Sequence, residues 1–247
     1  MPWTDIAFVI AICATLCLLA YWRGVLTLGG SLAALAIGLV IGIFGGLSWI
    51  LLLLLFLVTS FAATLYKFAA KKRLGLQEGR SGERGWRNVV ANGFPPFIIA
   101  ILASDWVRIL DRETGSVLFL CAVAVAASDT LASEIGVLAR KTWMITTRKR
   151  VRAGVNGGIS VPGQAAAAIA AIYTGIVGAL AFNYLDGTAL GWLHIVLIAD
   201  IGFLGCQLDS LIGATIETSG HVSKLTNNLI SISAGVIAGW LVIGWLL

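Results

Sequence analysis

The sequence predicts an all-α polytopic membrane protein, and three observations lead to this class. Hydrophobic residues make up 59% of the 247 positions, charged residues only 12%, and the mean hydropathy is +0.95. Apolar runs long enough to cross a bilayer, which takes about 20 helical residues, follow one another along the chain. The polar stretches between them are short. This pattern excludes an ordinary soluble protein, and we expect residues 1–247 to form a single integral membrane domain.

Eight apolar runs are candidate transmembrane helices. They cover approximately residues 5–22, 25–44, 47–66, 89–104, 116–138, 162–182, 189–213 and 226–247. The fourth is short and contains two consecutive prolines, Pro95 and Pro96, so we expect that helix to be broken, kinked or re-entrant. The first run begins without a basic leader segment and is expected to remain as a span.

The distribution of positive charge predicts the orientation in the membrane. Thirteen of the seventeen Lys and Arg residues lie within residues 67–87 and 140–152. Eight spans would place both segments on one side, which the positive-inside rule makes cytoplasmic. We therefore expect a multi-pass protein of the plasma (inner) membrane of a prokaryote, with its functional loops in the cytoplasm. Because topology explains the net charge of +5, no nucleic-acid partner is predicted.

Acidic residues at the inner ends of two spans are candidate metal ligands. Asp129 and Glu134 end the fifth span, and Asp209 lies in the seventh between Gly205 and Gly213 on one helical face. Acids in a span are costly unless they are hydrated, paired or bound to a cation, and Mg²⁺ usually takes one or two carboxylates. We expect the glycines to let the two helices approach and the acids to share Mg²⁺.

Simpler interpretations remain open for the same residues. Asp129 and Glu134 could pair with the neighbouring Arg140 or Lys141, and the Asp209 stripe could serve helix packing alone. The basic segment 67–87 could be a topological signal that contacts anionic lipid, or a flexible lid over a nucleotide. No Walker-type motif occurs, so a P-loop mechanism is not supported.

A basic loop and a glycine-rich turn follow the fifth span. Lys and Arg side chains neutralise phosphate oxygens, and glycines let backbone N–H groups approach them closely. Acids, bases and such a turn within about 30 residues indicate a site for a metal ion and phosphates.

The same segments carry a resemblance to a known family. The chain resembles the integral membrane proteins that include plant phytyl-phosphate kinase and animal transmembrane protein 19, and it is more distantly similar to polyprenol kinases and CDP-diacylglycerol synthases. The matching segments are Val90–Gly93, Ser128–Gly136, Ile145–Thr147, Gly154–Ser160, Asp209–Thr215 and Asn227–Asn228. One departure is Glu217, which stands where an amide is usual.

The resemblance implies phosphoryl transfer from CTP, with Mg²⁺, to a long-chain isoprenyl monophosphate of the phytyl or geranylgeranyl type. The implied metal ligands are Asp129, Asp209 and Glu134, and the implied catalytic set adds Lys149. Nucleotide phosphates are expected to meet Arg148, Arg152, Asn156, Gly157, Gly158 and Ser160, while Asn92 and Asn228 are polar candidates near the acceptor phosphate.

Other functions fit parts of this pattern. A transporter of ions or lipid phosphates would use the broken helix 89–104 and the midspan Asp200 as its pathway. Against this, the charges gather at one membrane face and no inverted repeat is evident. A CTP-dependent lipid cytidylyltransferase would need the same metal and phosphate site. A non-catalytic scaffold would leave the costly acids unexplained. A second copy of the chain is an open alternative as a partner.

Overall fold

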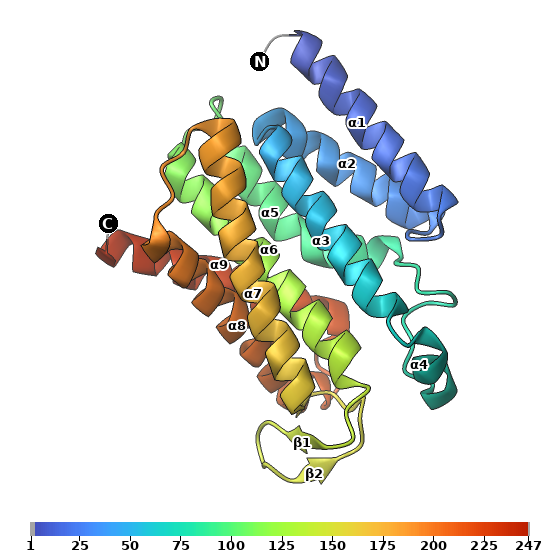
Figure 1. The fold of residues 1–247 in the computed structure, drawn as a ribbon. Helices are drawn as coiled ribbons and strands as arrows, with labels where there is room; N and C mark the ends of the chain where they lie inside the picture. The colour runs from blue at the N-terminus through green and yellow to red at the C-terminus, as the bar shows by residue number, and fades with distance from the viewer. Residues whose placement is uncertain (1–2, 247) are drawn as a thin grey trace.

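The computed structural model describes residues 3–246 and shows a helical bundle with a small β-sheet at one end (Figure 1). The α-helices are α1 (Trp3–Trp22), α2 (Leu28–Phe44), α3 (Leu47–Leu65), α4 (Phe68–Leu74), α5 (Trp86–Leu102), α6 (Arg112–Gly136), α7 (Val161–Ala181), α8 (Trp192–Ile212) and α9 (Lys224–Leu246). Two π-helical segments, η1 (Phe182–Asp186) and η2 (Gly213–Glu217), continue α7 and α8.

Helix α6 is the centre of the bundle. It packs against α3, α5, α7, α8 and α9, and its residues from Gly115 to Ser128 are all buried. Glycines on its neighbours make the close approach possible. A Cβ atom on Gly178 of α7 would lie 2.1 Å from Leu120, and one on Gly205 of α8 would lie 2.5 Å from Val125. The small-residue stripe of the seventh apolar run therefore faces the Asp129 helix, as we expected.

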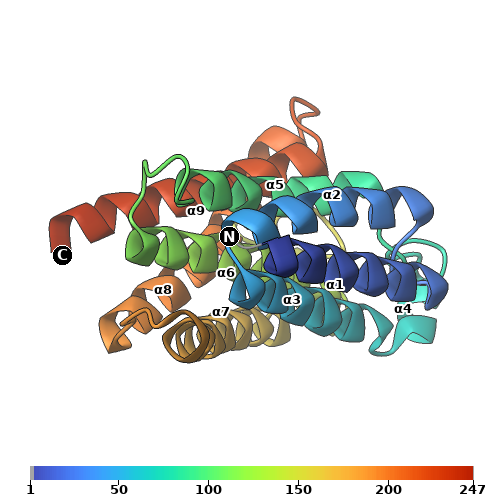
Figure 2. The same cartoon turned by 90° about the horizontal axis from the view of Figure 1, so that it is seen from above.

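Helix α1 lies at the edge of the bundle and packs against α2 (Figure 2). The contact uses the Gly38 and Gly42 spacing: Cβ atoms at these positions would lie 3.5 Å from the sulfur of Cys13 and 2.6 Å from Val9. The outer face of α1 carries exposed apolar side chains such as Leu18 and Trp22. In a membrane, this face would meet lipid.

The number of spans differs from the expectation. Helices occur at all eight predicted positions, but within residues 3–246 six are long and apolar enough to cross a membrane. Helices α2 and α5 have only 17 residues each, so the count of eight is not confirmed. Helix α5 also runs unbroken through Pro95 and Pro96, contrary to the predicted interruption. Its packing against α2, α6 and α9 holds the helix together despite the prolines.

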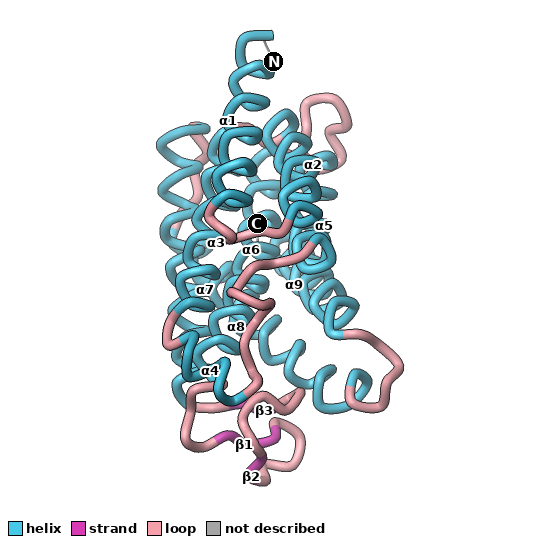
Figure 3. The backbone as a smooth tube through the Cα atoms, turned by 90° about the vertical axis from the view of Figure 1, so that its right-hand side faces the viewer, coloured by secondary structure: helices cyan, strands magenta, loops and turns pink. Residues whose placement is uncertain are grey.

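The basic loop after α6 forms a small antiparallel sheet that was not predicted. Its strands are β1 (Thr142–Met144), β2 (Arg150–Val151) and β3 (Gly158–Ile159), in the order β2-β1-β3, with Trp143 opposite both Arg150 and Ile159. The sheet and α4 lie at the same end of the bundle, and α1 begins at the opposite end (Figures 1 and 3). The two basic segments therefore share one end, as the charge pattern predicted.

Candidate functional site

A polar cavity of about 150 Å³ opens at the end of the bundle that carries the sheet. Its walls come from the last turns of α6, the start of α7, the end of α8 with η2, the turn before β3, and the first residue of α9. The polar side chains that line it include Asp129, Asn156, Ser160, Asp209, Glu217 and Lys224. Six of the predicted site residues, Asp129, Asp209, Asn156, Gly157, Gly158 and Ser160, are thus brought together.

Asp129 of α6 and Asp209 of α8 both line this cavity. The charge of the Lys224 ammonium group acts on both carboxyl groups. Asp209 is also fixed from α9, because the hydroxyl of Ser231 donates to its Oδ2 at 3.0 Å. Two carboxylates held side by side near one ammonium group form a concentrated negative site that favours a divalent cation.

Glu217, at the end of η2, is held by two amide groups. Asn156 donates to its Oε1 at 2.9 Å and Asn227 donates to its Oε2 at 3.0 Å. Asn227 also donates to the backbone oxygen of Asp209 at 3.0 Å. Its amide therefore links the end of α8 to the start of α9. The Glu217 carboxylate is thus paired with neutral donors and helps to join the turn to both helices.

The glycine-rich turn presses against η2 and leads into α7. Gly157 has φ +75°, and a Cβ atom there would lie 2.3 Å from Ala214, so this position requires glycine for both conformation and space. Ser160 then caps α7, with its Oγ accepting from the Gly163 N–H at 3.3 Å. Because Ser160, Gly163 and Gln164 line the cavity, the positive end of the α7 dipole opens into it, an arrangement that favours anions.

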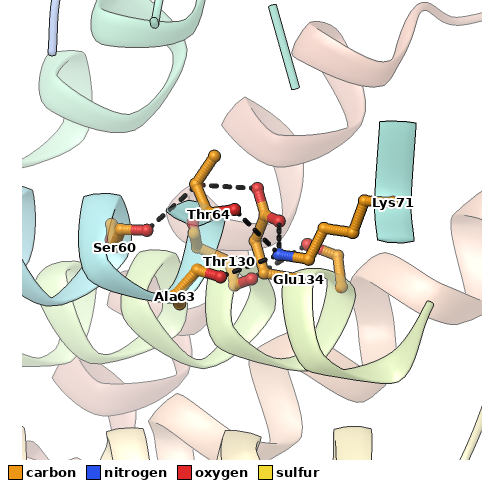
Figure 4. A network of polar contacts seen from close by, with 7 residues as sticks. Ser60, Ala63, Thr64, Lys71, Thr130 and Glu134 are labelled. Carbon is orange, nitrogen blue, oxygen red and sulfur yellow. Dashed lines mark hydrogen bonds and ion pairs between the residues drawn. The ribbon is translucent and has the colours of Figure 1, made fainter. Parts of the chain in front are cut away.

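Glu134 lies outside this cavity in a closed network (Figure 4). Its Oε1 accepts from the Thr64 hydroxyl at 2.7 Å, and its Oε2 accepts from the Lys71 ammonium group at 2.6 Å. Lys71 is fully buried and also donates to the backbone oxygens of Ala63 and Thr64, which caps the end of α3. Its partner is thus in α4, not the neighbouring Arg140 or Lys141.

The predicted three-carboxylate metal site does not form. No group of three or more His, Cys, Asp or Glu side chains in residues 3–246 is arranged to hold a metal ion. Both oxygens of Glu134 already accept hydrogen bonds, so of the three predicted ligands Asp129 and Asp209 line the cavity, together with Glu217.

The other predicted residues also lie apart from the cavity. Arg148, Lys149 and Arg152 are exposed on the outer part of the sheet, where Arg148 takes a left-handed conformation (φ 54°) in the turn between β1 and β2. Asn228 is buried in α9, and Asn92 lines a second, apolar cavity. Sequence reasoning missed Lys224 as a lining residue. The signal was a cation that opens an apolar span, three residues before the Asn227–Asn228 motif.

A protein family and several known proteins are similar to this chain. The model of the family described as "Integral membrane protein DUF92" matches residues 11–243. An uncharacterized membrane protein of Methanocaldococcus jannaschii is 31% identical over 215 residues, which are 86% of this chain and 84% of that protein. Protein PGR of Arabidopsis thaliana is 29% identical over 238 residues, covering 90% of this chain and 82% of the relative.

A third relative is the chloroplastic protein VTE6 of Arabidopsis thaliana, which is 29% identical over 217 residues, covering 86% of this chain and 63% of the relative. No solved structure matches the chain. The family match covers all the segments that form the cavity, from Asp129 to Lys224. The chain therefore belongs to the DUF92 family of integral membrane proteins.

Proposed function

We propose that this protein is a CTP-dependent isoprenyl-phosphate kinase that converts a long-chain isoprenyl monophosphate of the phytyl or geranylgeranyl type to the diphosphate. The observation that carries the proposal is the meeting of Asp129 and Asp209 in one cavity with Lys224, the glycine-rich turn and the start of α7. Acids for a cation and several groups for phosphates converge on the end of the bundle that carries the basic segments. The resemblance to plant phytyl-phosphate kinase points to the same chemistry.

The residues present fit a magnesium ion. Asp129 and Asp209 offer the one or two carboxylates that Mg²⁺ commonly takes, leaving room for water and phosphate oxygens to complete its shell. When bound there, the ion would neutralise charge on the transferring phosphoryl group. Lys224 would contact phosphate oxygens, and the α7 N-terminus with Asn156 and Gly157 would hold the nucleotide phosphates. Arg148, Lys149 and Arg152 would meet the parts of the nucleotide that extend towards the sheet.

The transfer itself requires little covalent chemistry from the protein. The acceptor is a phosphate monoester with a second pKa of about 6, so at neutral pH it is mostly a dianion and no general base is needed. One of its oxygens forms a bond to the γ-phosphorus as the bond from that phosphorus to the β–γ bridging oxygen breaks. The bonding electrons leave with CDP. Positioning and charge neutralisation therefore carry the catalysis.

The test is a direct assay of the purified protein with Mg²⁺, γ-labelled CTP and geranylgeranyl or phytyl monophosphate. We expect label in an extracted lipid diphosphate, and we expect Asp129→Asn and Asp209→Asn to abolish it. Label from α-labelled but not γ-labelled CTP would replace the proposal with lipid cytidylyl transfer. Absence of lipid label from both nucleotides would overturn it and favour transport, although the continuous helix α5 removes the broken helix on which that alternative relied.

A further inference from the structure

A second cavity of about 130 Å³ lies among α1, α2, α3 and α5. Figure 2 shows how these four helices are arranged in the bundle. Its walls are almost entirely apolar and include Leu16, Ala34, Ile37, Leu53 and Phe56. Its polar lining comes from the segment that leads into α5: Arg84, Asn88 and Asn92 follow one another at intervals of four residues. The cavity thus combines an apolar lining with a local group of polar side chains.

Arg84 is an unusual residue to find in this wall. It is only 5% exposed, its Nε is buried without a hydrogen-bond partner, and its side chain makes no hydrogen bond or ion pair with residues 3–246. Burial lowers the pKa of the guanidinium group, but an arginine stays protonated in proteins. The nearby carboxylates of Glu78, Glu134 and Asp129 act on this charge, but none of them forms an ion pair with it. A buried guanidinium group without a hydrogen-bonded partner is costly, which favours an anion bound at this site.

The backbone holds Arg84 at this position. Its N–H donates to the oxygen of Val25 at 3.0 Å, and its own oxygen accepts from the Thr27 N–H at 3.1 Å. A Cβ atom on Gly30 would lie 2.4 Å from that oxygen, so the start of α2 must have glycine to let the loop approach. These backbone contacts fix the position of Arg84, so its guanidinium group is buried because of the fold.

The same guanidinium group connects the two cavities. The carboxylates whose charges act on it are those of Glu78, of Glu134, which Lys71 already neutralises, and of Asp129, which lines the polar cavity. An anion bound by Arg84 would thus lie on the side of α6 where Asp129 begins the phosphate-transfer site. Asn92 belongs to this wall too, with its Oδ1 buried and unpartnered, and its amide donating to the Asn88 oxygen at 2.9 Å.

We propose that the apolar cavity among α1, α2, α3 and α5 binds the isoprenyl chain of the acceptor lipid and that Arg84 binds its phosphate. The guanidinium group pairs with phosphate oxygens through two parallel hydrogen bonds. The apolar walls remove the first isoprene units from the bilayer and orient the phosphate towards Asp129. The inference rests on the proposed function for the identity of the lipid, and it names the site at which that lipid binds.

Photocrosslinking tests the site without requiring catalysis. The full-length protein in lipid nanodiscs is irradiated with a diazirine-bearing geranylgeranyl monophosphate in the absence of nucleotide, and labelled peptides are mapped by mass spectrometry. We expect labels on α1, α2 and α3. Unlabelled geranylgeranyl monophosphate should compete, whereas geranylgeraniol, which lacks the phosphate, should not. Competition by phosphatidic acid at equal strength would show that the site takes phospholipid and would overturn the isoprenyl assignment.

Substitutions test the role of the Arg84 charge separately from the role of the cavity space. Arg84→Gln should reduce labelling by about tenfold or more, since charge-assisted hydrogen bonds are lost, and Arg84→Lys should restore part of it. The matched control is Arg87→Gln, because Arg87 is exposed and lies over the Trp86 ring. Equal labelling of Arg84→Gln and the wild type would overturn the phosphate assignment.

Ala34→Phe, which fills the cavity from α2, should reduce labelling, whereas Ala36→Phe on the exposed face of the same helix should not. This pair keeps the inference testable even if Arg84→Gln fails to fold, which its melting curve would show. Labels confined to α6–α9 would overturn the inference, even where the kinase assay succeeds. Labels in the cavity that depend on Arg84 would support it, even where no phosphoryl transfer is found.

Discussion

The two acids at the end of α6 have opposite surroundings, although only five positions separate them. Asp129 is partly exposed to a polar cavity, where it meets a second carboxylate, Asp209. Glu134 is buried, and both of its oxygens accept hydrogen bonds from Lys71 and Thr64. An arrangement that leaves like charges together is costly to the fold and available for binding, whereas a satisfied buried pair serves the fold. The difference teaches that the environment, rather than the residue type, separates a functional acid from a structural one.

The largest expected effect concerns Asp129 and Asp209, here called the open pair. Asp129→Asn or Asp209→Asn should lower phosphoryl transfer by about a hundredfold or more, because each removes a carboxylate that would hold the cation. Neither variant should lower the melting temperature, since each relieves repulsion between neighbouring carboxylates. Transfer assays and thermal melting of the same preparations check this prediction. An activity loss that merely tracks a loss of folded protein would contradict it.

Substitutions in the ion pair of Glu134 and Lys71 should lower stability rather than act first on phosphoryl transfer. Glu134→Gln leaves the Lys71 charge buried without its partner, which should cost about 3–5 kcal/mol of stability. Lys71→Met should cost a similar amount, and the double variant Glu134→Gln with Lys71→Met should recover part of it. Unfolding of the single and double variants measures the coupling. If Glu134→Gln instead abolished transfer and left melting unchanged, Glu134 would be a functional acid after all.

The turn beside the open pair gives a smaller effect. Gly157→Ala meets both a positive φ and Ala214, and we expect it to cost about 1–3 kcal/mol and to weaken nucleotide binding. Gly220→Ala is the matched control, because Gly220 also has a positive φ (+81°) but no neighbour within 4 Å of the added Cβ. It should cost about 1 kcal/mol and leave nucleotide binding unchanged. Equal nucleotide affinity in both variants would show that the glycine-rich turn does not bind the nucleotide.

The smallest effect concerns a third carboxylate, that of Glu83, which only backbone groups hold. The N–H groups of Arg80 and Ser81 donate to it at 3.0 and 2.6 Å and lower its pKa in the folded loop. A lowered folded pKa means that this contribution to stability is present above the unfolded pKa and is lost as the pH falls through the folded value. Limited proteolysis of segment 75–85 should therefore increase at acidic pH.

Glu83→Gln should be cleaved at neutral pH as readily as the wild type is at acidic pH, because the neutral amide accepts these hydrogen bonds more weakly. A cleavage rate in the wild type that does not change with pH would show that the carboxylate does not order the loop.

Local sequence signals located most of the helices and the two acids of the cavity, Asp129 and Asp209. Apolar runs placed eight helices, and the glycines around Asp209 correctly placed its helix against α6. The β-sheet could not be predicted, because its strands are two or three residues long and are fixed by pairing across a loop. The partner of Glu134 was equally hidden: Lys71 lies 63 residues earlier, in a segment with six other basic residues that gives no sign of which one becomes buried.

The pairing of Lys71 with Glu134 also imposes an order on biogenesis. Helices α3 and α4 are synthesised first, and 63 residues separate the lysine from its partner. At about 5–20 residues per second, several seconds pass before α6 has been made. During that interval the ammonium group must remain hydrated at the membrane surface, because burying it alone would be too costly. The hydrogen bonds from Lys71 that cap the end of α3 therefore form late. Once α6 is present, the Lys71–Glu134 ion pair joins α3 and α4 to it.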